Sequence, residues 1–215
     1  MTSRPSLSFE QPYFAQNLIV CGVDEAGRGP WAGPVVAAAV ILDPRNIPFG
    51  LNDSKKLTEA KREALFDSIM QSCVVGVGIV SAEIIDSINI LQATYQAMAE
   101  AVKALKQVPD VALVDGNRAP SLGLSVETII RGDAKSLSIA AASIIAKVTR
   151  DRLMHELHDS FPHYGFAKHK GYGTAVHAAA LAKHGPCIAH RKSFAPLVKL
   201  TISGQFDSRG VQHDS

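Results

Sequence analysis

Residues 18–42 read LIVCGVDEAGRGPWAGPVVAAAVIL, with an apolar run at each end and a polar, glycine-rich segment between them. The first run begins at Leu18 and stops at the adjacent acids Asp24 and Glu25, and the second run covers residues 35–42. Short apolar runs that are bounded by turn residues are typical of buried strands. We therefore predict two neighbouring strands, the first of which ends in two carboxylates.

The remaining apolar patterns predict three more strands and four helices. We expect the strands at residues 73–80, 111–115 and 126–131, and the helices at residues 59–70, 88–105, 138–157 and, after Thr174, up to Gly185. The early strands favour a meander, whereas the later strands, separated by a long helix, favour parallel pairing. The predicted fold class is therefore α/β on a mixed sheet.

The length and composition indicate one globular domain. The chain of 215 residues is 47% hydrophobic and 20% charged, which excludes a disordered protein. We expect a flexible N-terminal arm over residues 1–16, the domain over residues 17–200 and a flexible tail over residues 201–215. The three cysteines have neither a disulfide nor a zinc spacing. No apolar run is long enough for a membrane span and no secretory signal is found, so we expect a cytoplasmic protein.

The charged residues are distributed unevenly along the chain. The formal net charge is only +2, but residues 133–199 hold 10 of the 22 Lys and Arg residues, 4 of the 20 acids and seven of the eight histidines. Such a segment is expected of a surface that binds a polyanion, and it is equally typical of a solvated basic face. The pairs Lys55-Lys56 and Arg191-Lys192, taken singly, indicate solvated side chains.

Four carboxylates follow predicted strands: Asp24, Glu25, Asp115 and Asp133. Ligands of open α/β sheets bind at the carboxyl ends of the strands, where these acids would gather. Clustered carboxylates repel one another unless a cation neutralises them, and hard oxygen ligands suit Mg²⁺ or Mn²⁺. Each acid alone is also consistent with a turn or a helix cap. The combination favours a two-metal site of the kind that cleaves phosphodiesters.

Two glycine-containing segments carry further candidate ligand-binding residues. Gly27-Arg28-Gly29 allows the backbone to approach a ligand closely and offers a forked donor for phosphate, although a tripeptide of this kind is usually a turn. Residues 168–174 read KHKGYGT, in which Tyr172 either stacks on a base or sugar or belongs to the core. Neither segment identifies a function alone.

Several motifs in order along roughly residues 18–198 resemble bacterial ribonuclease HII. The most specific is GVDEAGRGP at residues 22–30. It is followed by AGPV at 32–35, DSKKL at 53–57, DG at 115–116, GD at 132–133, SIAAASI at 138–144, AKVTRD at 146–151, GYGT at 171–174 and HR-x-SF at 190–194. The related ribonuclease HIII has Lys in place of Arg28 and an extra N-terminal domain, and this chain has neither.

The resemblance implies an RNase H-like fold with a five-stranded mixed sheet, flanking helices and a helical C-terminal part. It implies cleavage of the RNA strand of RNA/DNA hybrids and nicking 5′ of single ribonucleotides in duplex DNA, leaving 5′-phosphate and 3′-hydroxyl ends. It also implies roles in removing ribonucleotides from DNA and in removing RNA primers. The implied metal ligands are Asp24, Glu25, Asp115 and Asp133; Gly27, Arg28 and Gly29 would read the ribose 2′-OH, and Tyr172 would stack on the following sugar.

Three further residues, Lys55, Ser143 and Lys147, are candidates for phosphate contact. We expect a monomer that binds RNA/DNA hybrid or ribonucleotide-containing duplex and does not bind membranes. The tail shows no clear sliding-clamp motif, so the sequence does not predict that partner. Two alternatives stay open: a non-catalytic hybrid or duplex binder that needs no metal, and a metal-dependent hydrolase of small phosphates. The basic segment and Tyr172 argue against the second alternative.

Overall fold

The computed structural model describes residues 4–118 and 120–202, and these residues form two compact units. Unit 1 contains residues 4–26, 36–79 and 94–149, apart from residue 119. Unit 2 contains residues 27–35, 80–93 and 150–202. Residues 203–215 of the expected tail lie outside the described residues.

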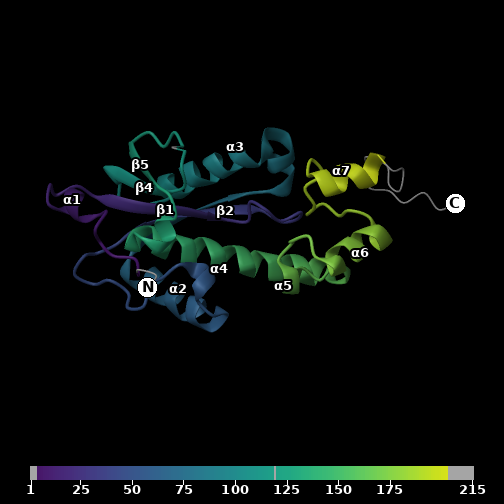
Figure 1. Cartoon of the computed structure of the whole chain (residues 1–215), viewed down its shortest axis with the longest axis horizontal. Coiled ribbons are helices and arrows are strands. Elements are labelled where there is room, and N and C mark those ends of the chain that lie inside the picture. The colour runs from purple at the N-terminus through teal and green to yellow at the C-terminus, as the bar shows by residue number, and fades with distance from the viewer. Residues whose placement is uncertain (1–3, 119, 203–215) are drawn as a thin grey trace. The chain divides into compact units, whose positions relative to one another are not determined.

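Each predicted strand and helix is present, but the first predicted helix separates the second and third strands, so the three early strands do not form a simple meander (Figure 1). The strands are β1 (Val20–Ala26), β2 (Val35–Ile41), β3 (Val74–Val80), β4 (Val111–Asp115) and β5 (Ser125–Ile129). The α-helices are α1 (Gln11–Phe14), α2 (Glu59–Ser72), α3 (Ala82–Lys103), α4 (Leu137–Ser160), α5 (Phe166–His169), α6 (Ala175–His184) and α7 (Ala195–Ile202). Three 3₁₀ turns are η1 (Ser54–Lys56), η2 (Gly132–Ala134) and η3 (Pro162–Tyr164).

The sheet of unit 1 is mixed and five-stranded, in the order β3-β2-β1-β4-β5. Strand β1 is antiparallel to β2 and parallel to β4, and β4 is parallel to β5. The predicted α/β fold on a mixed sheet, and the five strands that the resemblance implies, are therefore confirmed. Because β1, β4 and β5 run in the same direction, their carboxyl ends meet at one edge of the sheet.

The register of β1 and β4 places two of the predicted acids side by side. Val23 pairs with Val114, so Asp24 and Asp115 occupy the next position on neighbouring parallel strands. Side chains alternate between the faces of a strand, so Asp24 shares its face with Gly22. A Cβ atom on Gly22 would lie 2.1 Å from the backbone carbon of Ser138, which shows how closely the start of α4 approaches this face. The missing side chain allows that approach.

Helices cover both faces of the sheet within unit 1. Helices α2 and α4 lie on one side and α3 lies on the other (Figure 1). A buried cluster joins Val40 of β2 with Ile69 of α2 and Ile144 of α4. The sequence explains α2 directly, because the Thr58 side chain accepts a hydrogen bond from the N–H of Lys61 and caps its first turn.

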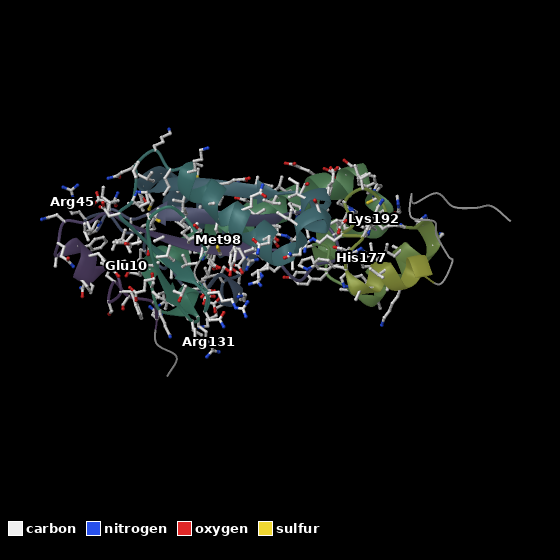
Figure 2. The ribbon with its side chains drawn as sticks, turned by 90° about the horizontal axis from the view of Figure 1, so that it is seen from above. Glu10, Arg45, Met98, Arg131, His177 and Lys192 are labelled. Carbon is white, nitrogen blue, oxygen red and sulfur yellow. The ribbon has the colours of Figure 1, made fainter. Side chains whose placement is uncertain are left out.

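The structure corrects the prediction of a flexible arm for residues 4–16. This segment contains α1, and Glu10 is fully buried in unit 1 (labelled in Figure 2). A Glu10 Oε1 atom accepts hydrogen bonds from the hydroxyls of Ser136 (2.5 Å) and Ser138 (2.7 Å) and from the N–H of Ser138 (3.0 Å). A carboxylate at the N-terminus of α4 also complements the helix dipole. The polar composition of the arm concealed this role.

Helix α3 begins at Ala82, six residues earlier than predicted, and is interrupted at Asn89. Asn89 has a φ of 67° and a ψ of 163°, which is not helical. Its Oδ1 atom accepts hydrogen bonds from the N–H groups of Leu91 (3.0 Å) and Gln92 (3.2 Å), as an N-cap side chain does. Asn89 therefore ends one helical segment and starts the next. Apolar periodicity alone does not reveal such a break.

Unit 2 has its own apolar cluster, in which Ala32 packs with Met154, Phe166 and Leu181. Ala32 also forms an isolated antiparallel bridge with His190. The segment that follows β1 in sequence is therefore held against the C-terminal part of the chain. In the part of the chain that the structure describes, no helix is both long and apolar enough to cross a membrane.

Replacing Glu10 with alanine should lower the free energy of unfolding by about 2 kcal/mol, because the N–H and hydroxyl groups at the start of α4 lose a buried charged acceptor. Urea unfolding followed by circular dichroism measures this change. The neighbouring exposed variant Gln11→Ala should change stability by less than about 0.5 kcal/mol. Equal stabilities of the Glu10 variant and the wild type would contradict the anchoring role.

Candidate active site

Asp24 is the most deeply buried of the predicted metal ligands, with 5% of its surface exposed. Its Oδ1 atom accepts a hydrogen bond of 2.7 Å from the N–H of Glu25, and the Ser143 hydroxyl also donates to its carboxylate. Burial raises the pKa of Asp24 well above its ordinary value, and the negative charges of Glu25 and Asp115 raise it further. These effects outweigh the two hydrogen bonds. A neighbouring cation would remove this penalty.

Asp115 and Asp133 are joined through the turn between them. Asp115 is the last residue of β4, and its Oδ1 atom accepts a hydrogen bond of 2.7 Å from the N–H of Gly132. Asp133 follows in η2, after Arg131 with a left-handed φ of 58°. Burial raises the pKa of Asp133, and the charges of Asp53 and Asp115 add to this increase. The structure thus brings the predicted acids into one electrostatic cluster in unit 1.

Lys55 adds a positive charge beside this cluster. Its Nζ atom lies 3.7 Å from Oδ2 of Asp133. Partial burial lowers the pKa of Lys55, but four negative charges outweigh that effect and raise it: Asp133, Asp24, Asp53 and Asp115. Lys55 lies in η1, whose first turn is capped by the side chain of Asp53 (2.9 Å to the N–H of Lys55). Lys55 is exposed, as expected from the sequence, and its ammonium group nevertheless lies beside the Asp133 carboxylate.

Asp53 is a member of the cluster that the sequence did not single out as a site residue. Its carboxyl group forms a side-chain hydrogen bond with Asp133, which raises the pKa of Asp133. The DSKKL motif contained the relevant signal, because it places Asp53 two residues before Lys55. Asp53 does not follow a strand, so the rule that ligand-binding acids lie at strand ends did not predict it.

The donor set fits a hard divalent cation. Four carboxylates without an intervening imidazole or thiolate are the ligands that Mg²⁺ and Mn²⁺ prefer. Among the described residues, no group of three or more His, Cys, Asp or Glu side chains is arranged so that it could hold a metal ion by itself. Mg²⁺ is usually held by one or two carboxylates, with water and substrate phosphate completing its shell. A divalent ion at this cluster would therefore need water or substrate phosphate as further ligands.

Two predicted phosphate-contacting residues lie on α4. Ser143 is 5% exposed, and besides its contact with Asp24 its hydroxyl lies 2.8 Å from that of Ser54. It is therefore placed to orient Asp24. Lys147 lies one helical turn after Ser143, on the same side of α4, and is half-buried. Its contact with phosphate stays a prediction.

The predicted ribose-reading residues lie together in unit 2. Arg28 and Gly29 are exposed, and Tyr172 is 49% exposed. A Cβ atom on Gly29 would lie 3.7 Å from Cε1 of Tyr172, so the loop and the ring are neighbours. The reading of Tyr172 as a core residue is wrong, because half of its surface faces solvent. An exposed ring beside an exposed arginine can stack on a nucleotide.

The turn that carries Tyr172 is tightly fixed. The N–H of Trp31 donates to the carbonyl of Gly171 (2.8 Å). Gly171 has a φ of 82°, and a Cβ atom there would lie 2.4 Å from the carbonyl oxygen of Ala32. A Cβ atom on Gly173 would lie 2.0 Å from the Trp31 ring. The glycines on either side of Tyr172 are therefore required by close packing, and they hold its backbone in one position.

A pair of buried histidines, which the sequence did not identify, supports Tyr172. His177 and His190 are 0% and 1% exposed, and their Nε2 atoms lie 3.0 Å apart (Figure 2 labels His177). The N–H of Cys187 donates to Nδ1 of His190, so neutral His190 must carry its proton on Nε2. His177 then accepts that hydrogen bond and donates from Nδ1 to the carbonyl of Tyr172 (3.0 Å). Burial lowers the pKa of His177 to about 4 and that of His190 to about 3.

The sequence interpretation of Arg191 as a solvated residue is wrong. Arg191 is 0% exposed, whereas Lys192 is exposed as expected. Arg150, in the AKVTRD motif, is also buried, with 1% of its surface exposed. The sequence around an arginine does not show whether its guanidinium is buried or solvated. The partners of these two buried guanidinium groups are backbone carbonyls that lie far away in the sequence.

Comparisons with known proteins cover most of the chain. The model of the family described as Ribonuclease HII matches residues 21–197. A Ribonuclease HII of Burkholderia pseudomallei (strain 668) is 56% identical over 196 residues, which cover 91% of this chain and 90% of that protein. The ribonuclease H2 structure from Pyrococcus horikoshii OT3 is 31% identical with a TM-score of 0.73, and the match covers 86% of this chain and 97% of that one. The PCNA:RNase HII complex from Archaeoglobus fulgidus gives 32% identity and a TM-score of 0.71, over 82% of this chain and 95% of that one.

Acid should destabilise the protein through His177 and His190. Their folded-state pKa values lie below the ordinary value of 6.5, so the fold favours the neutral rings. Their contribution to stability is complete above about pH 6.5 and is lost as the pH falls towards 4 and then 3. In urea unfolding, the stability lost between pH 7 and pH 5 should be roughly 4 kcal/mol smaller in the H177N/H190N variant than in the wild type, because each of the two histidines contributes about 2 kcal/mol over this range. The exposed variant His163→Gln should keep the wild-type slope; an unchanged slope in H177N/H190N would contradict the assignment.

Proposed function

Since the chain belongs to the ribonuclease HII family, whose members are metal-dependent endonucleases of RNA/DNA hybrids, we propose that it nicks duplex DNA on the 5′ side of single embedded ribonucleotides. The products would be 5′-phosphate and 3′-hydroxyl ends. The same activity on continuous hybrids would remove RNA primers. Removal of misplaced ribonucleotides from DNA would be the cellular role.

The observation that carries this proposal is the carboxylate cluster at the ends of the parallel strands. Asp24 and Asp115 lie at equivalent positions of β1 and β4, and Asp24 has a strongly raised pKa because it is buried beside other acids. We assign the two-metal site to Asp24, Glu25, Asp115 and Asp133. A pair of Mg²⁺ or Mn²⁺ ions bound there would activate water and stabilise the leaving 3′-oxygen.

Neighbouring residues would prepare these carboxylates for their role. Ser143 donates to Asp24 and restricts its rotation. The N–H of Gly132 fixes the direction of the Asp115 carboxylate. Lys55 partly offsets the negative charge, and its position beside Asp133 would also allow it to contact a substrate phosphate.

Substrate selection is assigned to the exposed residues of unit 2. The 2′-OH is the group by which a protein distinguishes RNA from DNA. Gly27, Arg28 and Gly29 would present backbone and guanidinium donors to that hydroxyl and to the adjoining phosphate. Tyr172, exposed beside Gly29, would stack on the sugar of the following deoxynucleotide.

The partners follow from the same chemistry. We propose that the protein acts in the cytoplasm as a monomer and binds RNA/DNA hybrid and ribonucleotide-containing duplex. One similar structure, from Archaeoglobus fulgidus, is a PCNA:RNase HII complex. A clamp remains a candidate partner for this chain, although its last residues show no clear clamp motif and residues 203–215 lie outside the described part.

Asp24→Asn should reduce cleavage of a duplex with one ribonucleotide by roughly a thousandfold or more, because the central metal ligand loses its charge. Binding of the same duplex, measured by fluorescence anisotropy, should persist. EDTA should abolish cleavage by the wild type. The exposed variant Asp67→Asn is the matched control and should retain full activity. Full activity of D24N, or cleavage in EDTA, would exclude the two-metal mechanism and favour a different function.

Tyr172→Ala should reduce cleavage at a single ribonucleotide about tenfold more than cleavage of continuous hybrid, because the junction loses a stacking partner. Arg28→Ala should shift the same ratio in the same direction. Tyr172→Phe retains the ring and should behave like the wild type. The ratio of kcat/KM values on the two substrates is the measurement, and equal losses on both would remove these residues from junction recognition.

A further inference from the structure

The buried guanidinium of Arg191 binds the backbone of a single loop. Its Nη2 atom donates to the carbonyl oxygens of Gly27 (2.6 Å), Gly33 (2.8 Å) and Pro34 (3.2 Å). Its Nη1 atom donates to the carbonyl of Arg28 (3.0 Å), and its Nε atom donates to that of Gly33 (3.0 Å). These bonds place the side chain on the inner side of residues 27–34.

The direction of these bonds determines where the loop amides point. The described peptides contain no cis bond, and the C=O and N–H of a trans peptide point in opposite directions. The carbonyl of Gly27 points at Arg191, so the N–H of Arg28 points away from it. The carbonyl of Arg28 also points at Arg191, so the N–H of Gly29 points away as well. Arg191 thereby turns the donors of this loop towards its outer side.

A second buried guanidinium supports the same loop. Arg150 donates from Nε to the carbonyl of Pro34 (3.0 Å) and from Nη2 to the carbonyl of Ala32 (3.2 Å). Gly27 has a φ of 97°, and a Cβ atom there would lie 2.0 Å from Nε of Arg150. Burial and the charge of Arg150 lower the pKa of Arg191 to about 9. Burial lowers the pKa of Arg150 to about 10, so both groups are charged at neutral pH.

The backbone of Arg191 is itself fixed. Its N–H donates to the carbonyl of Trp31 (2.8 Å), and the N–H of Gly33 donates to the carbonyl of Ala189 (2.8 Å). Immediately after Arg191, the Asp86 carboxylate accepts hydrogen bonds from the N–H groups of Lys192 (2.8 Å) and Ser193 (2.9 Å). A side chain anchored at both its base and its tip can set the geometry of the groups it binds.

We propose that Arg191 is a positioning residue for substrate selection: it sets the conformation in which residues 27–29 present the Arg28 side chain and the loop amides to the ribose. This inference rests on the proposed function of that loop. Arg191 is fully buried, so it acts through Arg28 and Gly29 and not by touching the substrate.

The guanidinium group is specifically required. Its rigid fork offers five donors, and here it binds carbonyls on four residues at once. A lysine ammonium has three donors at one point and cannot reach the same set. Arg191→Lys should therefore keep the buried charge but lose some of the hydrogen bonds to the loop carbonyls. The carbonyls left without a donor would favour a different loop conformation.

The test compares Arg191→Lys with Lys192→Met, which removes a neighbouring exposed charge. For each variant, kcat/KM is measured on a duplex with one ribonucleotide and on continuous hybrid, together with thermal stability. R191K should lower the ratio of the two kcat/KM values about tenfold, whereas K192M should leave it unchanged. A loss that is equal on both substrates would show a merely structural role and would overturn the proposal.

A double variant shows whether Arg191 acts through Arg28. If it does, the loss of selectivity in R28A/R191K should be smaller than the sum of the two single losses, because both changes act on the same loop. Additive losses would overturn the inference. If R28A does not change the ratio of the two kcat/KM values, the proposed role of the loop in substrate selection is wrong. If R28A changes this ratio and R191K does not, only the positioning role of Arg191 is wrong.

One measurement needs no substitution. In the wild-type protein, the Nε–H proton of Arg191 should exchange with solvent at least a hundredfold more slowly than an exposed guanidinium proton in NMR spectra, because it is buried and bonded to Gly33. Fast exchange would overturn the assignment even if the variants failed to fold.

Discussion

The parallel pairing of β1 with β4 is the constraint on which the carboxylate cluster depends. Because Val23 and Val114 are partners, Asp24 and Asp115 must occupy adjacent positions at the same edge of the sheet. The two acids cannot move apart unless the strand pairing is broken, so the fold itself keeps their negative charges close together. Burial, and then the repulsion between these charges, raise the pKa of Asp24, and the positive charge of Lys55 lies close enough to interact with Asp24. The sheet thus maintains a concentration of negative charge that a divalent cation would relieve.

Each unit uses a buried charged side chain to fix backbone that a functional residue needs. In unit 1, the Glu10 carboxylate accepts from the start of α4, the helix that carries Ser143. In unit 2, the Arg191 guanidinium donates to the loop that carries Arg28. The two groups have opposite hydrogen-bonding roles: the Glu10 carboxylate accepts from N–H and hydroxyl groups, and the Arg191 guanidinium donates to carbonyl groups. The Arg191 guanidinium is satisfied by main-chain carbonyls, whereas Glu10 is bonded through Oε1 alone and its buried Oε2 atom has no hydrogen-bond partner among the described residues.

The features that could be predicted are those that a short segment of the sequence determines by itself. The apolar run that stops at Asp24 and Glu25 located β1, and the rule for strand ends gathered Asp115 and Asp133 correctly. The roles of Glu10 and Arg191 could not be predicted, because their partners lie 126 and 158 residues away in the chain. A local pattern shows the charge of such residues and not the contacts that bury them. Asn89 illustrates the remaining gap: an apolar repeat continues through it although the helix does not.

The burial of Arg150 and Arg191 has a consequence for ionic strength. Mobile ions screen exposed charges within about 10 Å at 0.1 M salt, but they cannot enter the space that these two guanidinium groups occupy. Added salt should therefore weaken contacts made by exposed lysines such as Lys168, while the hydrogen bonds by which Arg150 and Arg191 hold the backbone of this loop stay intact. In concentrated salt, this loop would supply a growing share of the remaining attraction for a phosphate backbone.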